Sequence, residues 1–382
     1  TTEESSAASD VYKRQGLGGT SARHAPGGMT RPVDAVRSAV RSALSEVGAA
    51  GAGSGGIPLA LVACSGGPDS LVLAAAMAHV APTIGWRAGA VIVDHQLQPG
   101  SEDVTRTAAQ VCRDRGLDPV LTRAVSVTGP GGPEAAARHA RYRAISAVAA
   151  SCGAVAVLTG HTADDQAETV LLGLARGSGT RSLSGMSRIT TVPGDPGEEG
   201  SGPLLVRPLL GLDRATIDAA SAEWGLHPWR DPHNSDPRFT RSRVRHEVMP
   251  LLQDVLGPGV VAALARSSDL LRQDADALDA IAALQRDRLA DDLPAAEGGG
   301  SSTVVGHAPH LAELTPAVRR RIIRLCAREA GLPMGSLTAG HVESLDALIT
   351  HWRGQGAVAL PGGFEGVRRC GTLVIQPAPK GT

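Results

Sequence analysis

The sequence predicts an α/β protein, with a parallel sheet covered by helices on both faces, then a helical segment and a small C-terminal α+β domain. Short apolar runs alternate with helical patterns between residues 57 and 175, which is the rhythm of strands joined by helices. A loop of small residues joins the first run to its helix. The length of 382 residues, 42% of them hydrophobic, provides for two or three domains.

The first expected strand is Ile57–Ala63, and the helical pattern after the loop runs from Leu71 to Val80. Further strands are expected at residues 88–94, 119–123, 154–159 and 204–210, and further helices at residues 33–47, 101–115, 133–150 and 213–224. The pattern is helical again from Arg241 to about Leu289. Near the C-terminus we expect helices at residues 316–330 and 339–352, and a strand pair at residues 357–360 and 372–376.

These elements divide the chain into successive segments. Residues 1–28 are expected to be a disordered extension that is not native, with Met29 as the natural start. The expected segments after it are an N-terminal helix and linker at 29–56, a nucleotide-binding α/β domain at 57–230, a basic and helical substrate-binding region at 231–290, a linker at 291–302 and a small domain at 303–382.

Composition limits the classes of function. The net charge of −1 creates no global field toward nucleic acid or membrane, so a polyanionic partner must meet local basic patches. Five dispersed cysteines without a C-x-x-C pair favour reduced thiols and a cytoplasmic protein. No apolar run reaches the length of a transmembrane helix, so we expect no membrane association.

The loop S-G-G-P-D-S, residues Ser65 to Ser70, lies between a strand and a helix N-terminus. Free backbone N–H groups and the helix dipole make such a junction a phosphate site. The spacing is neither that of a Walker loop nor that of a dinucleotide fingerprint. The simpler alternative is a tight turn in which Asp69 or Ser70 caps the helix.

Two more polar clusters follow expected strands. Asp94 and His95 end the second strand, and G-H-T-A-D-D-Q-A-E-T begins at Gly160 after the fourth. A helix starting near His161 would place His161, Asp165 and Glu168 on one face, with Asp164 beside them. Ligands of parallel sheets bind at the carboxyl ends of strands, and carboxylates there suit Mg²⁺ with a nucleotide. Either aspartate alone would be explained as a complement to the helix dipole.

This ordered series of motifs resembles the N-type ATP pyrophosphatases of the PP-loop superfamily, and within them most closely the bacterial tRNA(Ile)-lysidine synthetase family. The resemblance continues through A-A-A-R-H-A-R-Y (135–142), L-A-R-G-S-G-T (174–180), V-R-P-L-L (206–210) and D-P-H-N-S-D-P-R-F-T-R-S-R-V-R (231–245). It implies a Rossmann-like sheet, with ATP and Mg²⁺ as cofactors. It covers residues 57–250 densely and the rest loosely.

The resemblance implies that the wobble cytidine of the CAU anticodon of tRNA(Ile) is adenylated by ATP. L-lysine then displaces AMP at the 2-position of the base. The implied nucleotide site comprises Ser65, Gly66, Gly67, Pro68, Asp69, Ser70, Asp94, His95 and Gly160. Asp69 and Asp165 would hold Mg²⁺. The implied catalytic set consists of Asp69, Asp165, His161, Arg138, Arg141 and Arg207. Asp164 or Glu168 would accept the proton of the lysine amine.

Local positive charge predicts the tRNA contacts. Arg238, Arg241, Arg243 and Arg245 lie within eight residues without an acid among them, which suits phosphate contacts. A second cluster, Arg319, Arg320, Arg321 and Arg324, is equally compatible with an ordinary solvated helix face. A homodimer is compatible with the sequence, which does not determine the oligomeric state.

Three alternatives stay open at this point. A tRNA thiolase of the same superfamily also adenylates a base, but paired cysteines or an iron–sulfur cluster would be expected. An amide-forming ATP pyrophosphatase ligase acting on a small molecule would leave the arginine-rich segment unexplained. A nucleotide-binding module without catalysis would bind ATP and form no AMP.

Overall fold

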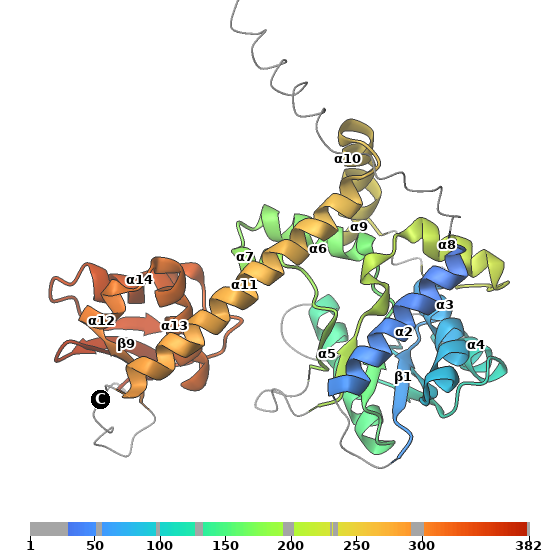
Figure 1. Cartoon of the computed structure of the whole chain (residues 1–382), viewed down its shortest axis with the longest axis horizontal. Coiled ribbons are helices and arrows are strands. Elements are labelled where there is room, and N and C mark those ends of the chain that lie inside the picture. The colour runs from blue at the N-terminus through green and yellow to red at the C-terminus, as the bar shows by residue number, and fades with distance from the viewer. Residues whose placement is uncertain are drawn as a thin grey trace, which may run out of the picture. The chain divides into compact units, whose positions relative to one another are not determined.

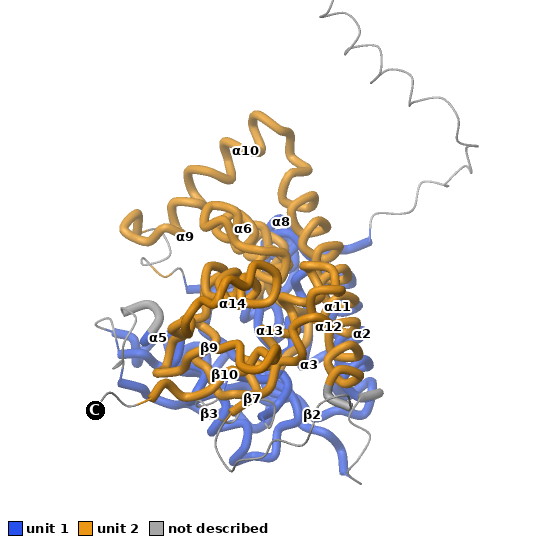
Figure 2. Tube along the Cα trace, turned by 90° about the vertical axis from the view of Figure 1, so that its left-hand side faces the viewer, with its two compact units in different colours: residues 1–160, 191–229 blue, residues 161–190, 230–382 orange. Residues whose placement is uncertain are grey.

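The computed structural model describes residues 30–50, 56–96, 100–126, 133–193, 202–229, 231, 236–291 and 302–379. They form two compact units (Figure 2). The first unit contains the chain up to Gly160 and Thr191–Trp229, and the second contains His161–Thr190 and the chain from Arg230 onward. The expected extension at 1–28 lies outside the described residues, as does nearly all of the expected linker at 291–302.

The first unit is built on a sheet of strand order β3-β2-β1-β4-β6-β5. Figure 1 labels β1 of this sheet near the helices of the same unit. Its strands are β1 (Leu59–Ala63), β2 (Arg87–Asp94), β3 (Val120–Ala124), β4 (Ala156–Leu158), β5 (Ile189–Thr191) and β6 (Leu204–Val206). The pairs from β3 across to β6 are parallel. The predicted fold class is therefore confirmed. The division between the two units falls within the edge strand β5.

Helices pack on this sheet because its strands are apolar toward both faces. Tyr142 and Ile145 of α5 pack against Leu59 and Leu61 of β1. Ala60 and Val62, which alternate with them, are fully buried as well. The helical elements of the unit are α2 (Pro32–Ala50), α3 (Pro68–Val80), η2 (Ala81–Ile84), α4 (Ser101–Asp114), α5 (Pro133–Ser151), η3 (Pro208–Gly211) and α8 (Arg214–Glu223).

Two boundaries in this unit differ from the sequence prediction. The strand expected at 204–210 ends at Val206, because Pro208 cannot donate to a sheet ladder and instead starts the short 3-10 helix η3. The helix expected from Leu71 begins at Pro68, inside the loop, with Pro68 in its first turn.

The second unit begins with α6 (Ala163–Ala175) and α7 (Thr180–Leu183), and continues with α9 (Thr240–Arg243), the π-helix η5 (Val244–Val248), α10 (Met249–Leu256) and α11 (Val260–Asp291). The helical pattern predicted from Arg241 is confirmed, with a break at Gly257, whose φ of 96° ends α10. Ala163 and Ala167 of α6 pack with Met249 and Val261, so α6 shares a core with the later helices.

The C-terminal part has a four-stranded antiparallel sheet of order β7-β10-β9-β8. It contains β7 (Thr303–His307), α12 (Ala308–Glu313), α13 (Pro316–Glu329), α14 (Ala339–Thr350), β8 (Val358–Leu360), β9 (Phe364–Arg369) and β10 (Thr372–Pro377). The prediction that residues 357–360 pair with 372–376 is wrong, because β9 lies between them. Gly366 weakens the strand pattern of β9. A Cβ there would lie 2.1 Å from a methyl carbon of Leu345, so a larger residue would have to displace this side chain.

Among the described residues, no single helix has the length and apolar character of a membrane span. One helix pair, Thr240–Leu256 with Val260–Leu289, meets both criteria only when taken together, across a bend of 98°.

Three arginines of α13 form ion pairs with carboxylates of the same unit. Arg319 and Asp346 are both about 5% exposed and form a buried ion pair, and Arg320 Nε donates to Asp346 at 3.1 Å. Arg321 Nε donates to Asp279 of α11 at 2.7 Å. Three of the four arginines in the second predicted basic cluster thus have carboxylate partners, which supports the structural alternative for this cluster.

Removal of the Asp346 carboxylate should destabilise the protein strongly. Asp346→Ala leaves Arg319 buried without its counter-charge, which costs about 3–5 kcal/mol of unfolding free energy. Burial alone would raise the pKa of Asp346, but Arg319 and Arg320 outweigh it and hold the pKa low. The stabilisation is therefore present at neutral pH and is lost as the pH falls through this lowered pKa.

Urea unfolding of Asp346→Ala and Glu343→Ala measures this effect. Glu343 contacts Arg320 at 3.7 Å and is 60% exposed, so its removal should leave the unfolding midpoint unchanged. Equal midpoints for the two variants would contradict the importance of the buried pair.

Candidate active site

The loop between β1 and α3 has a fixed backbone. Cys64 N–H donates to the Val91 carbonyl of β2 at 2.9 Å, which holds the end of β1. Gly66 has a φ of 81°, a conformation that other residues rarely adopt. Gly67 then caps α3 in an extended conformation, with no side-chain hydrogen bond to the helix. The first N–H groups of α3 are therefore not used by a side-chain cap.

Ser70 connects the two ends of the loop. Its Oγ donates to the Gly67 carbonyl at 3.0 Å and accepts from Ser65 N–H at 3.2 Å. Ser65 Oγ lies 3.4 Å from the same hydroxyl. These bonds close the loop around the N-terminus of α3, where backbone N–H groups and the helix dipole favour an anion. The local structure thus suits phosphate.

Two further segments approach the loop within the first unit. A Cβ on Gly160, directly after β4, would lie 2.9–3.1 Å from Asp69 atoms, two of them backbone atoms. Only glycine allows this approach without displacing α3. On the other side, Trp229 N–H donates to the Gly66 carbonyl at 3.0 Å. The sequence prediction included Gly160 as a binding residue and did not anticipate the Trp229 contact.

Four candidate site positions of this unit follow the carboxyl ends of strands. Ser65 follows β1, His95 follows β2, Gly160 follows β4 and Arg207 follows β6. Since these strands are parallel, all four positions fall at one edge of the sheet. The sequence placed the phosphate loop, the Asp94–His95 pair and the His161–Glu168 cluster at this edge. The strand order agrees for the first two, whereas the residues from His161 to Glu168 belong to the second unit.

His95 is held neutral at this edge. Burial is the main cause that lowers the pKa of His95, and the positive charge of Arg141 lowers this pKa further. The negative charge of Asp94 acts in the opposite direction. Asp94 is buried, and its Oδ1 accepts the Gln96 N–H at 2.9 Å, so it fixes the turn after β2. Neutral imidazole beside a guanidinium can accept a hydrogen bond without adding charge.

The predicted arginines of the first unit lie on two elements. Arg138 and Arg141 of α5 place their guanidinium carbons 4.9 and 5.7 Å from the centroid of the Tyr142 ring. Burial lowers the pKa of Arg141, with Arg138 acting in the same direction and Tyr142 opposing. Arg207 is 6% exposed at the start of η3. A guanidinium this buried suits an anionic partner.

In the second unit, α6 begins with a capping box. Thr162 is the N-cap, and its N–H donates to Asp165 Oδ2 at 2.9 Å. The helix therefore starts at Ala163, two residues later than predicted. His161 precedes the N-cap, so the expectation of His161 on one helical face with Asp165 and Glu168 is wrong.

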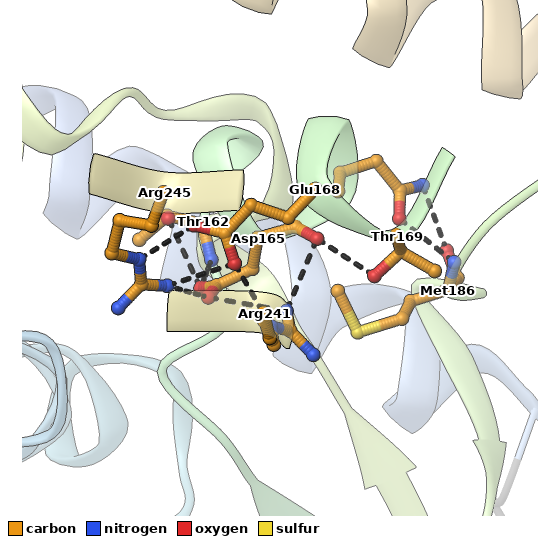
Figure 3. Close-up of polar contacts among 8 residues, drawn as sticks. Thr162, Asp165, Glu168, Thr169, Met186, Arg241 and Arg245 are labelled. Atoms are coloured by element: carbon orange, nitrogen blue, oxygen red, sulfur yellow. Dashed lines mark hydrogen bonds and ion pairs between the residues drawn. The ribbon is translucent and has the colours of Figure 1, made fainter. Parts of the chain in front are cut away.

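Asp165 and Glu168 are buried and meet two arginines of the later segment (Figure 3). Arg245 donates to Glu168 Oε1 at 2.6 Å and to Asp165 Oδ1 at 2.7 Å. Arg241 donates to Glu168 Oε2 at 2.8 Å and reaches Asp165 Oδ1 at 3.4 Å. Two carboxylates and two guanidinium groups thus neutralise one another, and we call these four residues the carboxylate–arginine cluster.

The cluster keeps Asp165 ionised. Burial alone would raise the pKa of Asp165, but the charges of Arg245 and Arg241 and the Thr162 N–H outweigh it and lower the pKa. Both oxygens of Asp165 already accept hydrogen bonds. The structure therefore gives Asp165 a capping and ion-pairing contact set, and its assignment as a Mg²⁺ ligand stays a prediction.

The four predicted tRNA arginines separate into two kinds. Arg241 and Arg245 donate to buried carboxylates of α6. Arg238 pairs with Asp236 and Arg243 with Glu247, and their side chains remain 79% and 59% exposed. Only the second kind presents its guanidinium largely to solvent. Arg241 and Arg245 differ from the other two because their carboxylate partners lie far away in the sequence. A count of local charge does not reveal such partners.

No group of three or more His, Cys, Asp or Glu side chains in the described part of the chain is arranged to hold a metal. Mg²⁺ needs only one or two protein carboxylates when phosphate oxygens complete its shell. Asp69, in the first turn of α3 and partly buried, fits that requirement.

The parallel sheet with its anion-binding loop defines a protein of the PP-loop class, and residues 55–252 match the PP-loop domain family. Residues 307–371 match the TilS substrate binding domain. The tRNA(Ile)-lysidine synthase of Thermobifida fusca is 50% identical over 345 residues, covering 90% of this chain and 98% of that protein. The tRNA(Ile)-lysidine synthase of Streptomyces coelicolor is 53% identical over 320 residues, covering 84% and 85%. The chain therefore belongs to the tRNA(Ile)-lysidine synthase family.

Gly160→Ala should weaken nucleotide binding at least tenfold while the protein stays folded, because the new Cβ displaces the Asp69 backbone and with it the start of α3. Calorimetric titration with ATP measures the effect. Gly211→Ala is the matched control, since nothing lies within 4 Å of its Cβ position. Equal affinities for the two variants would contradict the role of the close approach.

Arg245→Ala should lower the unfolding free energy by about 3 kcal/mol, because Glu168 is 1% exposed and loses one of its two guanidinium partners. Arg243→Ala removes an exposed pair two residues away, and its unfolding midpoint should not change. Chemical denaturation compares the two. A stable Arg245→Ala protein would show that the cluster does not hold α6.

Proposed function

We propose that this chain ligates L-lysine to the 2-position of the wobble cytidine in the CAU anticodon of tRNA(Ile), using ATP and releasing AMP and pyrophosphate. The phosphate loop carries the proposal, since Gly160 and Trp229 hold it at the N-terminus of α3 in a chain of this family. The ligase activity follows the names of its relatives, which cover most of this chain.

In the first step, O2 of the cytidine attacks the α-phosphorus of ATP, the α–β phosphoanhydride bond breaks and pyrophosphate leaves. The backbone of Ser65–Ser70 would bind the leaving pyrophosphate, with Asp69 contributing to a Mg²⁺ site. Mg²⁺ would neutralise charge that develops on the phosphate oxygens. Arg138, Arg141 and Arg207 belong to the same unit as the loop and would offset the remaining negative charge.

In the second step, the neutral ε-amine of lysine attacks C2 of the adenylated base, and AMP leaves with the electrons of the C–O bond. The amine loses one proton, which a carboxylate accepts. Glu168 already accepts hydrogen bonds from Arg241 and Arg245 in the structure. Asp164, half-buried in the first turn of α6, is the acceptor that we favour. His161 would contact phosphate or position a reacting group.

The thiolase alternative gains no support from the cysteines. All five are free, and the described residues hold no cluster of metal-binding side chains. A lysine ligase acting on tRNA would work where tRNA and ATP meet, and we therefore propose a cytoplasmic location.

The direct test incubates the protein with ATP, Mg²⁺, labelled lysine and a CAU-anticodon tRNA(Ile) transcript, and follows the label into RNA. Label should enter the RNA only when ATP is present. The absence of lysine-dependent incorporation at every salt concentration would refute the proposed function.

Asp69→Asn should reduce AMP release at least about a hundredfold, because one charged ligand near the pyrophosphate is lost. Asp103→Asn is the matched control, as Asp103 pairs with Arg106 on the surface of α4 and is 76% exposed. Thermal unfolding confirms that both variants are folded. Full activity in Asp69→Asn would remove Asp69 from the catalytic set.

A further inference from the structure

The C-terminal domain exposes an aromatic ring in a protein that has few of them. Aromatic residues make up 2% of the chain. Trp352, two residues beyond the end of α14, is 40% exposed, whereas Trp86 in the first unit is 7% exposed. Trp352 does not belong to the hydrophobic core of its domain. Part of its ring is therefore accessible to a partner, as is part of the Trp229 ring, which is 36% exposed.

Arg368 of β9 supports this ring from one side. Its guanidinium carbon lies 5.3 Å from the centroid of the Trp352 ring, at cation–π distance. The same guanidinium donates to the Leu348 carbonyl at 3.0 Å, in the last turn of α14. Arg368 is thereby fixed by the helix end, and it covers one face of the indole.

The loop that carries the ring is braced by Gln355. Gln355 Nε2 donates to the His351 carbonyl at 2.8 Å, and Gln355 Oε1 accepts the Arg353 N–H at 2.5 Å. These bonds flank Trp352 on both sides along the chain. Trp352 is thus held in place by hydrogen bonds of its neighbours and by Arg368, so the exposed part of the ring is preorganised.

The charge around the ring is positive. Arg353 is exposed, and within the described ranges no ion pair joins it to a carboxylate. The acids of this region are engaged: Asp346 binds Arg319 and Arg320, and Glu365 accepts from Gln376 at 2.8 Å. Glu365 also lies on the opposite face of β9 from Arg368, because side chains alternate along a strand.

We propose that Trp352, Arg353 and Arg368, which we call the Trp352 platform, bind the tRNA substrate. The exposed part of the indole stacks on a base, and Arg353 contacts a phosphate. An aromatic ring backed by a guanidinium and flanked by an unpaired arginine suits a polyanion with stacking surfaces better than an apolar or acidic partner. This proposal rests on the proposed function, because it takes tRNA as the ligand.

The test measures binding of a full-length tRNA(Ile) transcript to the whole protein, by filter retention at several salt concentrations. Trp352→Ala should weaken binding about tenfold, and Trp352→Phe should keep most of the affinity, because stacking needs an aromatic ring. Arg353→Ala should weaken binding and reduce the slope of affinity against salt by about one charge. Arg328→Ala is the control, an exposed α13 arginine in the same domain, and should change neither quantity.

Lysine incorporation by the same proteins separates the two proposals. With Trp352→Ala, the KM for tRNA should rise while kcat is unchanged. Wild-type affinity in Trp352→Ala, or equal losses in Arg353→Ala and Arg328→Ala, would overturn the platform and leave the proposed function intact. If the wild-type protein binds tRNA with a platform-dependent affinity and incorporates no lysine, the proposed reaction fails and the binding surface stands.

Discussion

Two buried carboxylates on α6 impose the constraint on which the second unit depends. Glu168 is 1% exposed, and Asp165 is 9% exposed. Buried charges of this kind cost several kcal/mol unless opposite charges and hydrogen bonds meet them. Arg241 and Arg245 supply both, from 73 to 80 residues further along the chain. The segment Thr240–Val248 must therefore dock on α6, and its π-helical turn lies where the two arginines reach the same glutamate.

The first unit follows a different constraint, which is steric rather than electrostatic. The end of β4 can lie against the start of α3 only because Gly160 has no side chain. Ser70 closes the loop internally, and the absence of a side-chain cap leaves N–H groups of α3 for an anion. A charge cluster therefore organises one unit, whereas close backbone packing organises the phosphate loop of the other.

Local patterns predicted the features that local residues determine. The apolar run at 57–63 and the loop after it sufficed for β1 and the phosphate site, because burial and turn chemistry act over a few residues. The partners of Arg241, Arg245 and Arg319 lie 27 to 80 residues away, so the charge of the surrounding sequence suggested RNA contacts for side chains that the fold turns toward carboxylates. β9 was not predicted for a similar reason. The glycine at position 366 leaves room for Leu345 of α14, and this contact is not visible in the local sequence.

The longest helix has a mechanical consequence. With 32 residues, α11 is roughly 48 Å long, and within its unit it contacts α6 and α7 as well as α13 and β7. Gln166 of α6 donates to Ser268 near one end at 3.0 Å, and Arg321 of α13 donates to Asp279 further along at 2.7 Å. A straight helix does not stretch, so a displacement of α6 must bend α11, break these contacts or carry the C-terminal domain with it. The helix that carries the two carboxylates and the domain that carries the Trp352 ring therefore both pack on α11, which couples their positions.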